Sequence, residues 1–133
     1  MRIREASGED VPAIQRLLRS LPGVWQESWR ADVIERAMSS AAGLALVALR
    51  GETLVGFVSA HDVGFRGYLS ELAVSETEQR SGVGTELLRH IERKLADRGC
   101  SMLIADVHPP AAPFYRKLGW ADPPATLLRR RLR

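Results

Sequence analysis

The stretch Gln79-Arg80-Ser81-Gly82-Val83-Gly84-Thr85 joins an apolar segment, residues 67–74, to a longer amphipathic segment, residues 82–98. The first segment is β-prone, and apolar residues recur at helical spacing in the second, so the sequence predicts strand, loop and helix. A helix N-terminus presents unpaired backbone N–H groups, and glycines let a ligand approach the backbone closely. The loop is therefore a candidate anion site, although an isolated Gly-x-Gly pair is more often only a turn.

Two nucleotide-binding motifs do not fit this loop. A P-loop requires a lysine directly after its last glycine, and no lysine follows Gly82 or Gly84. A dinucleotide fingerprint requires a third glycine where Leu87 stands, and a shorter approach loop. Asp106 lies near the position expected for a ribose-binding acid, but too little chain follows for the rest of a doubly wound sheet.

The segments on either side of the loop predict a mixed α/β (α+β) fold with flanking helices. Further helices are predicted at residues 10–21, 30–40 and 112–118, and strands at residues 1–6, 44–49, 53–61 and 102–107, with a last short strand that includes Leu127 and Leu128. The strand-helix-strand unit of residues 67–107 implies a parallel pair. We expect a mostly antiparallel twisted sheet with this one parallel pair, in a single domain of residues 1–133.

Composition excludes several classes of protein. The 133 residues are 45% hydrophobic and 26% charged, as in globular domains. No apolar run approaches the roughly 18 residues of a membrane span, and the N-terminus does not read as a secretory signal, so we expect a cytoplasmic protein without a membrane partner. Cys100 is the only cysteine, which excludes an internal disulfide, and no cluster of side chains has metal-ligand spacing, so no metal is expected.

The net charge of +3 is concentrated at the C-terminus. Four of the 19 basic residues are Arg129, Arg130, Arg131 and Arg133, so the rest of the chain has 15 basic and 16 acidic residues, a net charge of −1. Proteins that bind nucleic acid usually spread basic residues over a whole face. Nucleic acid is not expected as the principal partner, although a role of the arginine tail in such binding stays open.

Two motifs in order resemble a known family. Residues 79–84 match the Gln/Arg-x-x-Gly-x-Gly/Ala signature of the GNAT superfamily, the acetyl-CoA-dependent N-acetyltransferases. Glu71-Leu-Ala-Val74 is similar to the family's fourth strand, and Phe114-Tyr-Arg-Lys-Leu-Gly-Trp120 to its second motif, about 30 residues later. The chain differs from the family at residues 108–110, His-Pro-Pro where an asparagine is common, and in its shorter C-terminal part. The sheet edge there is either open or completed by a second subunit, so both a monomer and a homodimer remain possible.

The resemblance implies transfer of the acetyl group of acetyl-CoA to a primary amine of a small molecule or peptide, by direct attack in a ternary complex. The acceptor must lose a proton, and the departing thiolate is helped by an acid. By resemblance Tyr115 is the acid; Glu71 is the best-placed base, with His61 as a second candidate. The same resemblance implies a set of residues around acetyl-CoA: Leu72, Ala73, Val74, Gln79, Arg80, Ser81, Gly82, Val83, Gly84, Thr85 and Phe114, the last of which is also expected to pack in the core.

Acceptor choice is expected to depend on the loop between the first two helices. Trp25, Glu27 and Trp29 are candidates for an aromatic and acidic wall around a cationic amine, with His61 near it. The competing interpretation is that these aromatics only anchor the loop. A second hypothesis for the whole chain is a noncatalytic acyl-CoA-binding regulatory module, which needs the phosphate loop but neither acid nor base.

Overall fold

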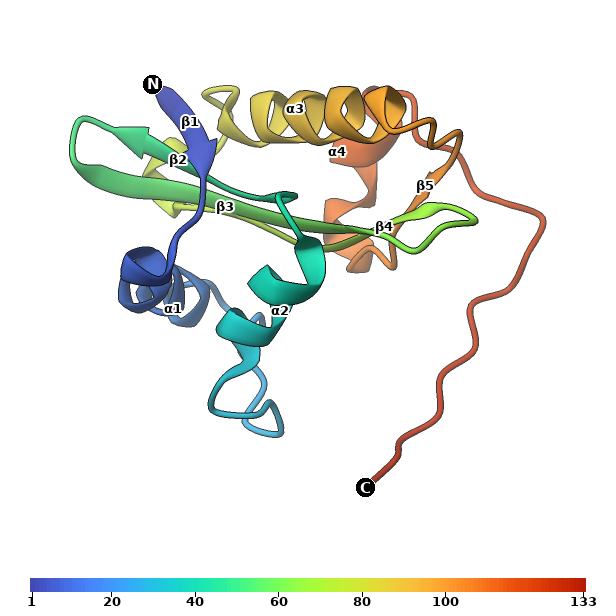
Figure 1. The fold of residues 1–133 in the computed structure, drawn as a ribbon, viewed down its shortest axis with the longest axis horizontal. Coiled ribbons are helices and arrows are strands. Elements are labelled where there is room, and N and C mark those ends of the chain that lie inside the picture. Colours follow the sequence, from blue (N-terminus) through green and yellow to red (C-terminus); the bar gives the residue numbers. More distant parts are fainter.

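A computed structural model describes residues 1–133, and its centre is a five-stranded sheet with strand order β1-β2-β3-β4-β5 (Figure 1). Neighbouring strands are antiparallel except for β4 and β5, which are parallel. The mixed sheet predicted from the sequence is thereby confirmed. The strands are β1 (Arg2–Glu5), β2 (Ala45–Arg50), β3 (Thr53–Asp62), β4 (Gly67–Val74) and β5 (Leu103–Ile104).

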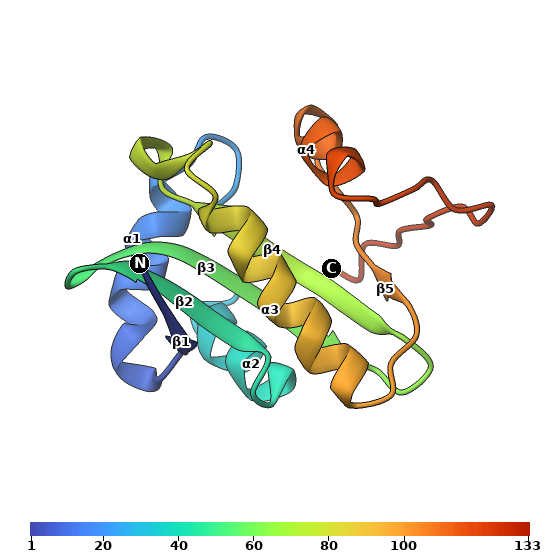
Figure 2. The ribbon, with the colours of Figure 1, turned by 90° about the horizontal axis from the view of Figure 1, so that it is seen from above.

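Helices cover both faces of the sheet (Figures 1 and 2). One face carries α1 (Val11–Ser20) and α2 (Val33–Ala41), and the other carries α3 (Val83–Asp97), with α4 (Ala112–Lys117) beside the β5 edge. The apolar stripe predicted for α3 is buried against the sheet: Val83, Leu87, Leu88, Ile91 and Leu95. None of the helices combines the length and the apolar character needed to cross a bilayer.

Two glycines of the sheet let α3 pack closely against it. A Cβ atom at Gly56 of β3 would lie 2.9 Å from Val83 Cγ1, and one at Gly67 of β4 would lie 2.8 Å from Leu95 Cδ1. Real Cβ atoms do not approach other carbons so closely, because interiors are already close-packed. The missing side chains therefore let α3 lie directly on β3 and β4, with the start of the helix beyond the end of β4.

Two predicted strands differ from the structure. The strand predicted at residues 102–107 is paired only at Leu103 and Ile104, because the chain then turns away from β4. The predicted last strand with Leu127 and Leu128 is wrong: residues 121–133 contain no strand, and both leucines are largely exposed. The two-residue β5 offers little edge for a further strand, and the Pro123-Pro124 pair lacks the N–H groups that a ladder needs.

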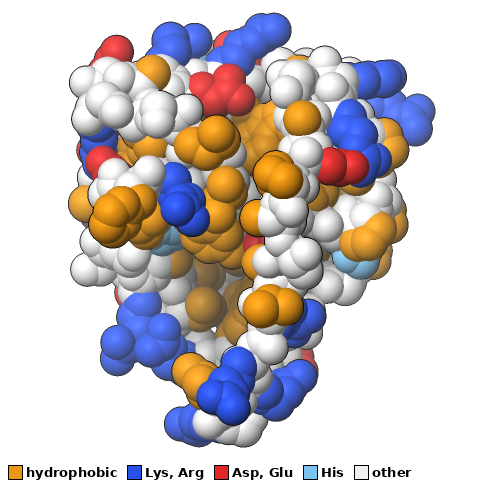
Figure 3. All heavy atoms as spheres, turned by 90° about the vertical axis from the view of Figure 1, so that its right-hand side faces the viewer, with side chains coloured by type: hydrophobic (Ala, Val, Ile, Leu, Met, Phe, Trp, Pro, Cys, Tyr) orange, Lys and Arg blue, Asp and Glu red, His pale blue; other side chains and the backbone are white.

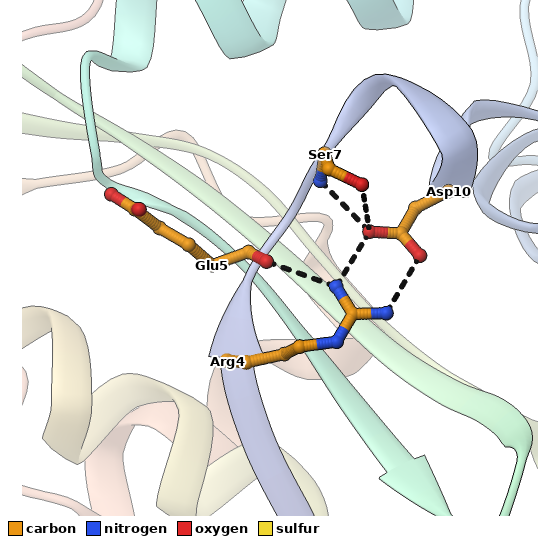
Figure 4. Close-up of polar contacts among 4 residues, drawn as sticks. All are labelled: Arg4, Glu5, Ser7 and Asp10. Atoms are coloured by element: carbon orange, nitrogen blue, oxygen red, sulfur yellow. Dashed lines mark hydrogen bonds and ion pairs between the residues drawn. The ribbon is translucent and has the colours of Figure 1, made fainter.

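A polar cluster joins β1 to the start of α1 (Figure 4). The guanidinium of Arg4 donates two hydrogen bonds to the Asp10 carboxylate, at 2.8 and 3.0 Å, and the Ser7 N–H donates to the same carboxylate at 2.8 Å. These bonds, led by those from Arg4, lower the pKa of Asp10. Asp10 is 9% exposed, so a charged side chain is buried here with its acceptors satisfied.

Candidate active site

A cleft opens where β4 and β5 diverge. The two strands pair only at Gly67–Leu103 and Tyr68–Ile104, so the rest of β4 has no strand partner on that side. The cleft has a volume of about 1200 Å³, enough for a sizeable ligand. Its walls are residues 69–74 of β4, residues 105–109 after β5, the α1–α2 loop, Tyr115 of α4 and part of the C-terminal tail. Figure 3 looks onto this side, where hydrophobic side chains line a hollow.

The open edge of β4 presents free backbone groups to the cleft. The Ser75 N–H donates to the Val55 carbonyl of β3 at 2.8 Å. Because successive residues of a strand point their backbone groups to opposite sides, the N–H groups of Leu72 and Val74 point away from β3. The Gln79 side chain donates to the Val74 carbonyl at 3.1 Å from this same edge. The N–H of Leu72 is thus available to a carbonyl oxygen in the cleft.

The N-terminus of α3 forms a cradle of unpaired donors. Gly82 begins the helix in the left-handed conformation, with φ +91°, and the first helical bond runs from the Glu86 N–H to the Gly82 carbonyl at 3.0 Å. The four N–H groups of Gly82, Val83, Gly84 and Thr85 have no acceptor in the chain. Four free donors at the positive end of a 15-residue helix suit a pyrophosphate. This donor set beside the cleft fits coenzyme A.

The other cofactor candidates surround this cradle. Leu72, Ala73, Val74 and Gln79 line the cleft. Arg80 and Ser81 belong to the turn before α3, where Arg80 has φ +71° and the Ser81 hydroxyl donates to the Glu78 carbonyl.

Phe114 lies on the surface rather than in the core. The side chain is 36% exposed, which corrects the core position expected from the sequence. Its ring stands over the start of α3, because a Cβ atom at Gly84 would lie 3.3 Å from Phe114 Cζ. The reason for the exposure is that α4 is short and turns Tyr115, its next residue, inward.

Glu71 is a half-buried carboxylate without a hydrogen-bond partner in the chain, and it lines the cleft from the middle of β4. Burial, and secondly the negative charge of Asp106, raise its pKa to about 7. A carboxylate with such a pKa is present in both protonation states near neutral pH and is suited to accept a proton.

Tyr115 faces the same cleft from α4. The side chain is 9% exposed and its ring packs edge-on against Phe114 and Trp120, with centroids 5.2 and 5.3 Å away. Burial, and secondly the charge of Glu71, raise the pKa of Tyr115 to about 12. The hydroxyl is therefore protonated at neutral pH and is suited to donate.

His61 lies behind the cleft wall rather than in it. Its Nδ1 is 2.9 Å from the Ser40 hydroxyl of α2, and its Nε2 is 2.7 Å from the Ser70 hydroxyl of β4. Ser70 lines the cleft and His61 does not. Burial lowers the pKa of His61, so the ring is neutral at pH 7. Any proton exchange between His61 and the cleft would pass through Ser70.

The aromatic residues of the α1–α2 loop lie in two different surroundings. Trp29 lines the cleft, whereas Trp25 and Glu27 do not. Trp25 packs edge-on against Trp29 at 5.2 Å and lies under the Arg19 guanidinium of α1 at 4.3 Å, and Glu27 lies 3.8 Å from the same arginine. Arg19 thus holds the loop to α1, and this contact leaves Trp29 at the cleft.

Several cleft residues were not assigned to the site from the sequence. Asp106 accepts a hydrogen bond from the Tyr68 hydroxyl at 2.7 Å, where β4 and β5 separate. Ser70, Arg129 and Arg131 also line the cleft. Asp106 interrupts an apolar run, which is a usable signal. The position of Arg129 and Arg131 at the cleft depends on tertiary structure and leaves no local pattern.

The comparisons with known proteins agree with this geometry. The model of the Acetyltransferase (GNAT) family matches residues 11–120. Glucosamine 6-phosphate N-acetyltransferase of Candida albicans is 24% identical over 120 residues, which are 90% of this chain and 74% of that protein.

Solved structures share the fold. PaiA N-acetyltransferase of Thermoplasma acidophilum, in complex with coenzyme A, has a TM-score of 0.81 at 20% identity and covers 94% of this chain and 92% of its own. An aminoglycoside 6'-N-acetyltransferase of Acinetobacter haemolyticus has a TM-score of 0.78 at 19% identity and covers 98% of both chains. Since the family model matches most of the chain, including both motifs and the open edge of β4, this protein belongs to the acetyltransferase (GNAT) family and is an acyltransferase that uses acetyl-CoA.

Proposed function

We propose that this protein transfers the acetyl group of acetyl-CoA to a primary amine of a small molecule or peptide, by direct attack in a ternary complex. The observation that carries the proposal is the pair formed by Glu71 and Tyr115 in one cleft. Their pKa values of about 7 and about 12 leave one group able to accept a proton and the other able to donate one at neutral pH. A noncatalytic acyl-CoA module would need neither.

Each residue has a definite part in this reaction. Bound acetyl-CoA supplies an acyl group activated as a thioester. Glu71 accepts the proton of the acceptor ammonium, directly or through a water molecule, and so frees the amine lone pair for attack. The Leu72 N–H donates to the carbonyl oxygen as it gains negative charge. Tyr115 would donate its proton to the sulfur as the carbon–sulfur bond breaks. The nitrogen, which still carries an extra proton after the attack, would pass that proton to the Tyr115 oxygen, so that an amide and a thiol form and the phenol is restored.

Binding of the cofactor tests the first half of the proposal. We would titrate the protein with acetyl-CoA by calorimetry, with NAD as a control ligand. Gly82→Val should weaken binding at least about tenfold, because a β-branched residue disfavours φ +91° and the cradle would have to rearrange. Gly99→Val is the matched control: Gly99 follows the same helix at φ +87°, also with open space around it, and should bind normally. No binding of acetyl-CoA to the native chain would overturn the proposed function.

Measurement of turnover tests the second half of the proposal, the catalytic part. With an acceptor found by screening amines, Tyr115→Phe should lower kcat by about tenfold to a hundredfold and leave the affinity for acetyl-CoA unchanged. Glucosamine 6-phosphate is the first acceptor to screen, because it is the substrate named for the Candida albicans relative. Binding of acetyl-CoA without turnover on any amine would favour the noncatalytic module. Cytoplasmic location, a single domain and a monomeric or homodimeric state stay predictions.

A further inference from the structure

The C-terminal tail, residues 121–133, contains no helix or strand, and it leaves the β5 side of the sheet and extends toward the side that carries α1 and α2 (Figure 1). Leu127, Arg129 and Arg131 line the cleft, and the residues between and after them do not. Side chains of an extended chain point alternately to opposite sides. Arg129 and Arg131 therefore lie on the cleft side of the tail and Arg130 on its other side, while Arg133 follows the last residue that lines the cleft.

No group of the chain neutralises the two cleft-lining arginines. The ion pairs of the structure end at Asp122, which pairs with Arg116, and no hydrogen bond within the chain involves residues 123–133. Lys and Arg side chains gather at one end of the hollow in Figure 3. Arg129 and Arg131 thus have all their donors available to a ligand.

The end of the tail lies on the side of the sheet that carries α1 and α2 (Figure 1). In Figure 1 the helix α3, which carries the unpaired N–H cradle, is on the opposite face. Gln26, Ser28 and Trp29 of the α1–α2 loop, which connects the two helices of that face, also line the cleft. The phosphates of a cofactor held at α3 are therefore not the natural partner of Arg129 and Arg131.

The cleft has charges of both signs on different walls. Glu71 and Asp106 contribute negative charge near the divergence of β4 and β5, and Arg129 and Arg131 contribute positive charge on the tail. A ligand that complements both walls has a cationic end and an anionic end. We propose that Arg129 and Arg131 bind a carboxylate or phosphate group of the acceptor. The preferred acceptor is then an amine that also carries such an anionic group. This inference rests on the proposed function.

Matched pairs of acceptors test the inference. Glucosamine 6-phosphate and glucosamine differ by the phosphate, and 6-aminohexanoate and 6-aminohexanamide differ by the carboxylate, far enough from the amine to leave its basicity alike. CoA release would be followed for each compound with the native enzyme, with Arg129→Gln/Arg131→Gln and with Arg130→Gln/Arg133→Gln. Both double variants remove the same charge from the same tail, so only position distinguishes them.

The native enzyme should prefer the anionic member of at least one pair, and the pair that shows the preference identifies phosphate or carboxylate as the group bound. Arg129→Gln/Arg131→Gln should raise KM for that acceptor by about tenfold, and Arg130→Gln/Arg133→Gln should change it less than about twofold. The difference should shrink as salt is added, since exposed charges are screened.

The failures of the two proposals are distinguishable. Binding of acetyl-CoA with no preference for either anionic amine, or equal losses in both double variants, would overturn the tail inference and leave the proposed function standing. No binding of acetyl-CoA would overturn the proposed function itself. Circular dichroism of each variant would show that the fold is intact.

Discussion

Asp10 and Glu71 are two carboxylates that the fold partly removes from water, and their surroundings shift their pKa values in opposite directions. Asp10 receives two hydrogen bonds from Arg4 and one from the Ser7 N–H, and its pKa is lowered. Glu71 receives no hydrogen bond, and burial raises its pKa to about 7. The first carboxylate is stabilised as an anion, whereas the second is poised between its charged and neutral forms at neutral pH.

The difference separates a carboxylate with a structural role from one that we propose takes part in the reaction. The hydrogen-bonded Asp10 carboxylate connects β1 to the start of α1, and its lowered pKa keeps it ionised at neutral pH. An unpartnered carboxylate in a cleft makes the folded state less stable above its unfolded pKa, a cost that chains tolerate chiefly at functional sites. The contrast predicts that replacing Glu71 lowers activity and raises stability, whereas replacing Asp10 lowers stability and leaves activity unchanged.

The largest effect is expected for Glu71→Gln. If Glu71 is the base, this change should lower kcat by about a hundredfold to a thousandfold near pH 7.5. It should also raise the free energy of unfolding there by about 2 kcal/mol, because the folded state no longer holds a carboxylate whose pKa is raised. Rates of CoA release and urea unfolding would measure the two quantities.

The control for Glu71→Gln is Glu76→Gln, an exposed carboxylate that lines the same cleft. It should leave both quantities nearly unchanged. The gain in stability also depends on pH. Because the pKa of Glu71 is raised in the folded state, its contribution to stability is present below about pH 4.3 and is lost as pH rises toward 7. Glu71→Gln should therefore be no more stable than the native protein in acid. A variant with kcat close to the native value would remove Glu71 as the base.

Asp10→Ala should have a smaller effect, and it should lower the free energy of unfolding where Glu71→Gln raises it. Losing a buried carboxylate that accepts four hydrogen bonds should lower the free energy of unfolding by about 1 to 2 kcal/mol near pH 7. Because the pKa of Asp10 is lowered, its contribution is present above about pH 3.9 and is lost as pH falls below that value. Urea unfolding near pH 7 and in acid would measure both, and kcat should stay at the native value.

Asp32→Ala is the matched control for Asp10→Ala. Asp32 also precedes a helix and pairs with an arginine, Arg36 at 2.9 Å, but its side chain is 51% exposed. Exposed pairs contribute little, so its loss should cost less than about 0.5 kcal/mol. Equal losses of stability at the two positions would show that the buried Arg4–Asp10 pair contributes no more than the exposed Asp32–Arg36 pair.

The sequence predicts most of the sheet and helices because their signals are local. Residues 82–98 combine a helical stripe with glycines at both ends, and Arg50-Gly51-Glu52 gives the β2–β3 turn. The end of β5 and the course of the tail were predicted incorrectly, because strand pairing depends on a partner that local sequence does not reveal. Leu127 and Leu128 have β propensity but no strand to pair with.

The site is predictable only in the part carried by motifs. Glu71, Tyr115 and the start of α3, which the motifs single out, all lie at or beside one cleft, and their roles stay predictions. The positions of His61 behind Ser70, of Trp25 under Arg19 and of Arg129 at the cleft depend on contacts between segments distant in the sequence. Side-chain type restricts what such residues do, and only tertiary structure selects which of them meet.

The smallest expected effect tests why the pKa of Glu71 is raised. Burial is the first cause and the charge of Asp106 the second. Asp106→Asn keeps an oxygen that can accept the Tyr68 hydroxyl but removes the charge, so the pKa of Glu71 should fall and the acid limb of kcat/KM should move to lower pH by up to about one unit. Asp122→Asn, which removes an exposed carboxylate paired with Arg116 at 3.0 Å, should leave the limb in place. A limb that stayed at its native pH in Asp106→Asn would mean that burial alone raises the pKa of Glu71, or that another group titrates. Repeating the profile with Glu71→Gln separates these two cases, since the limb disappears only if Glu71 produces it.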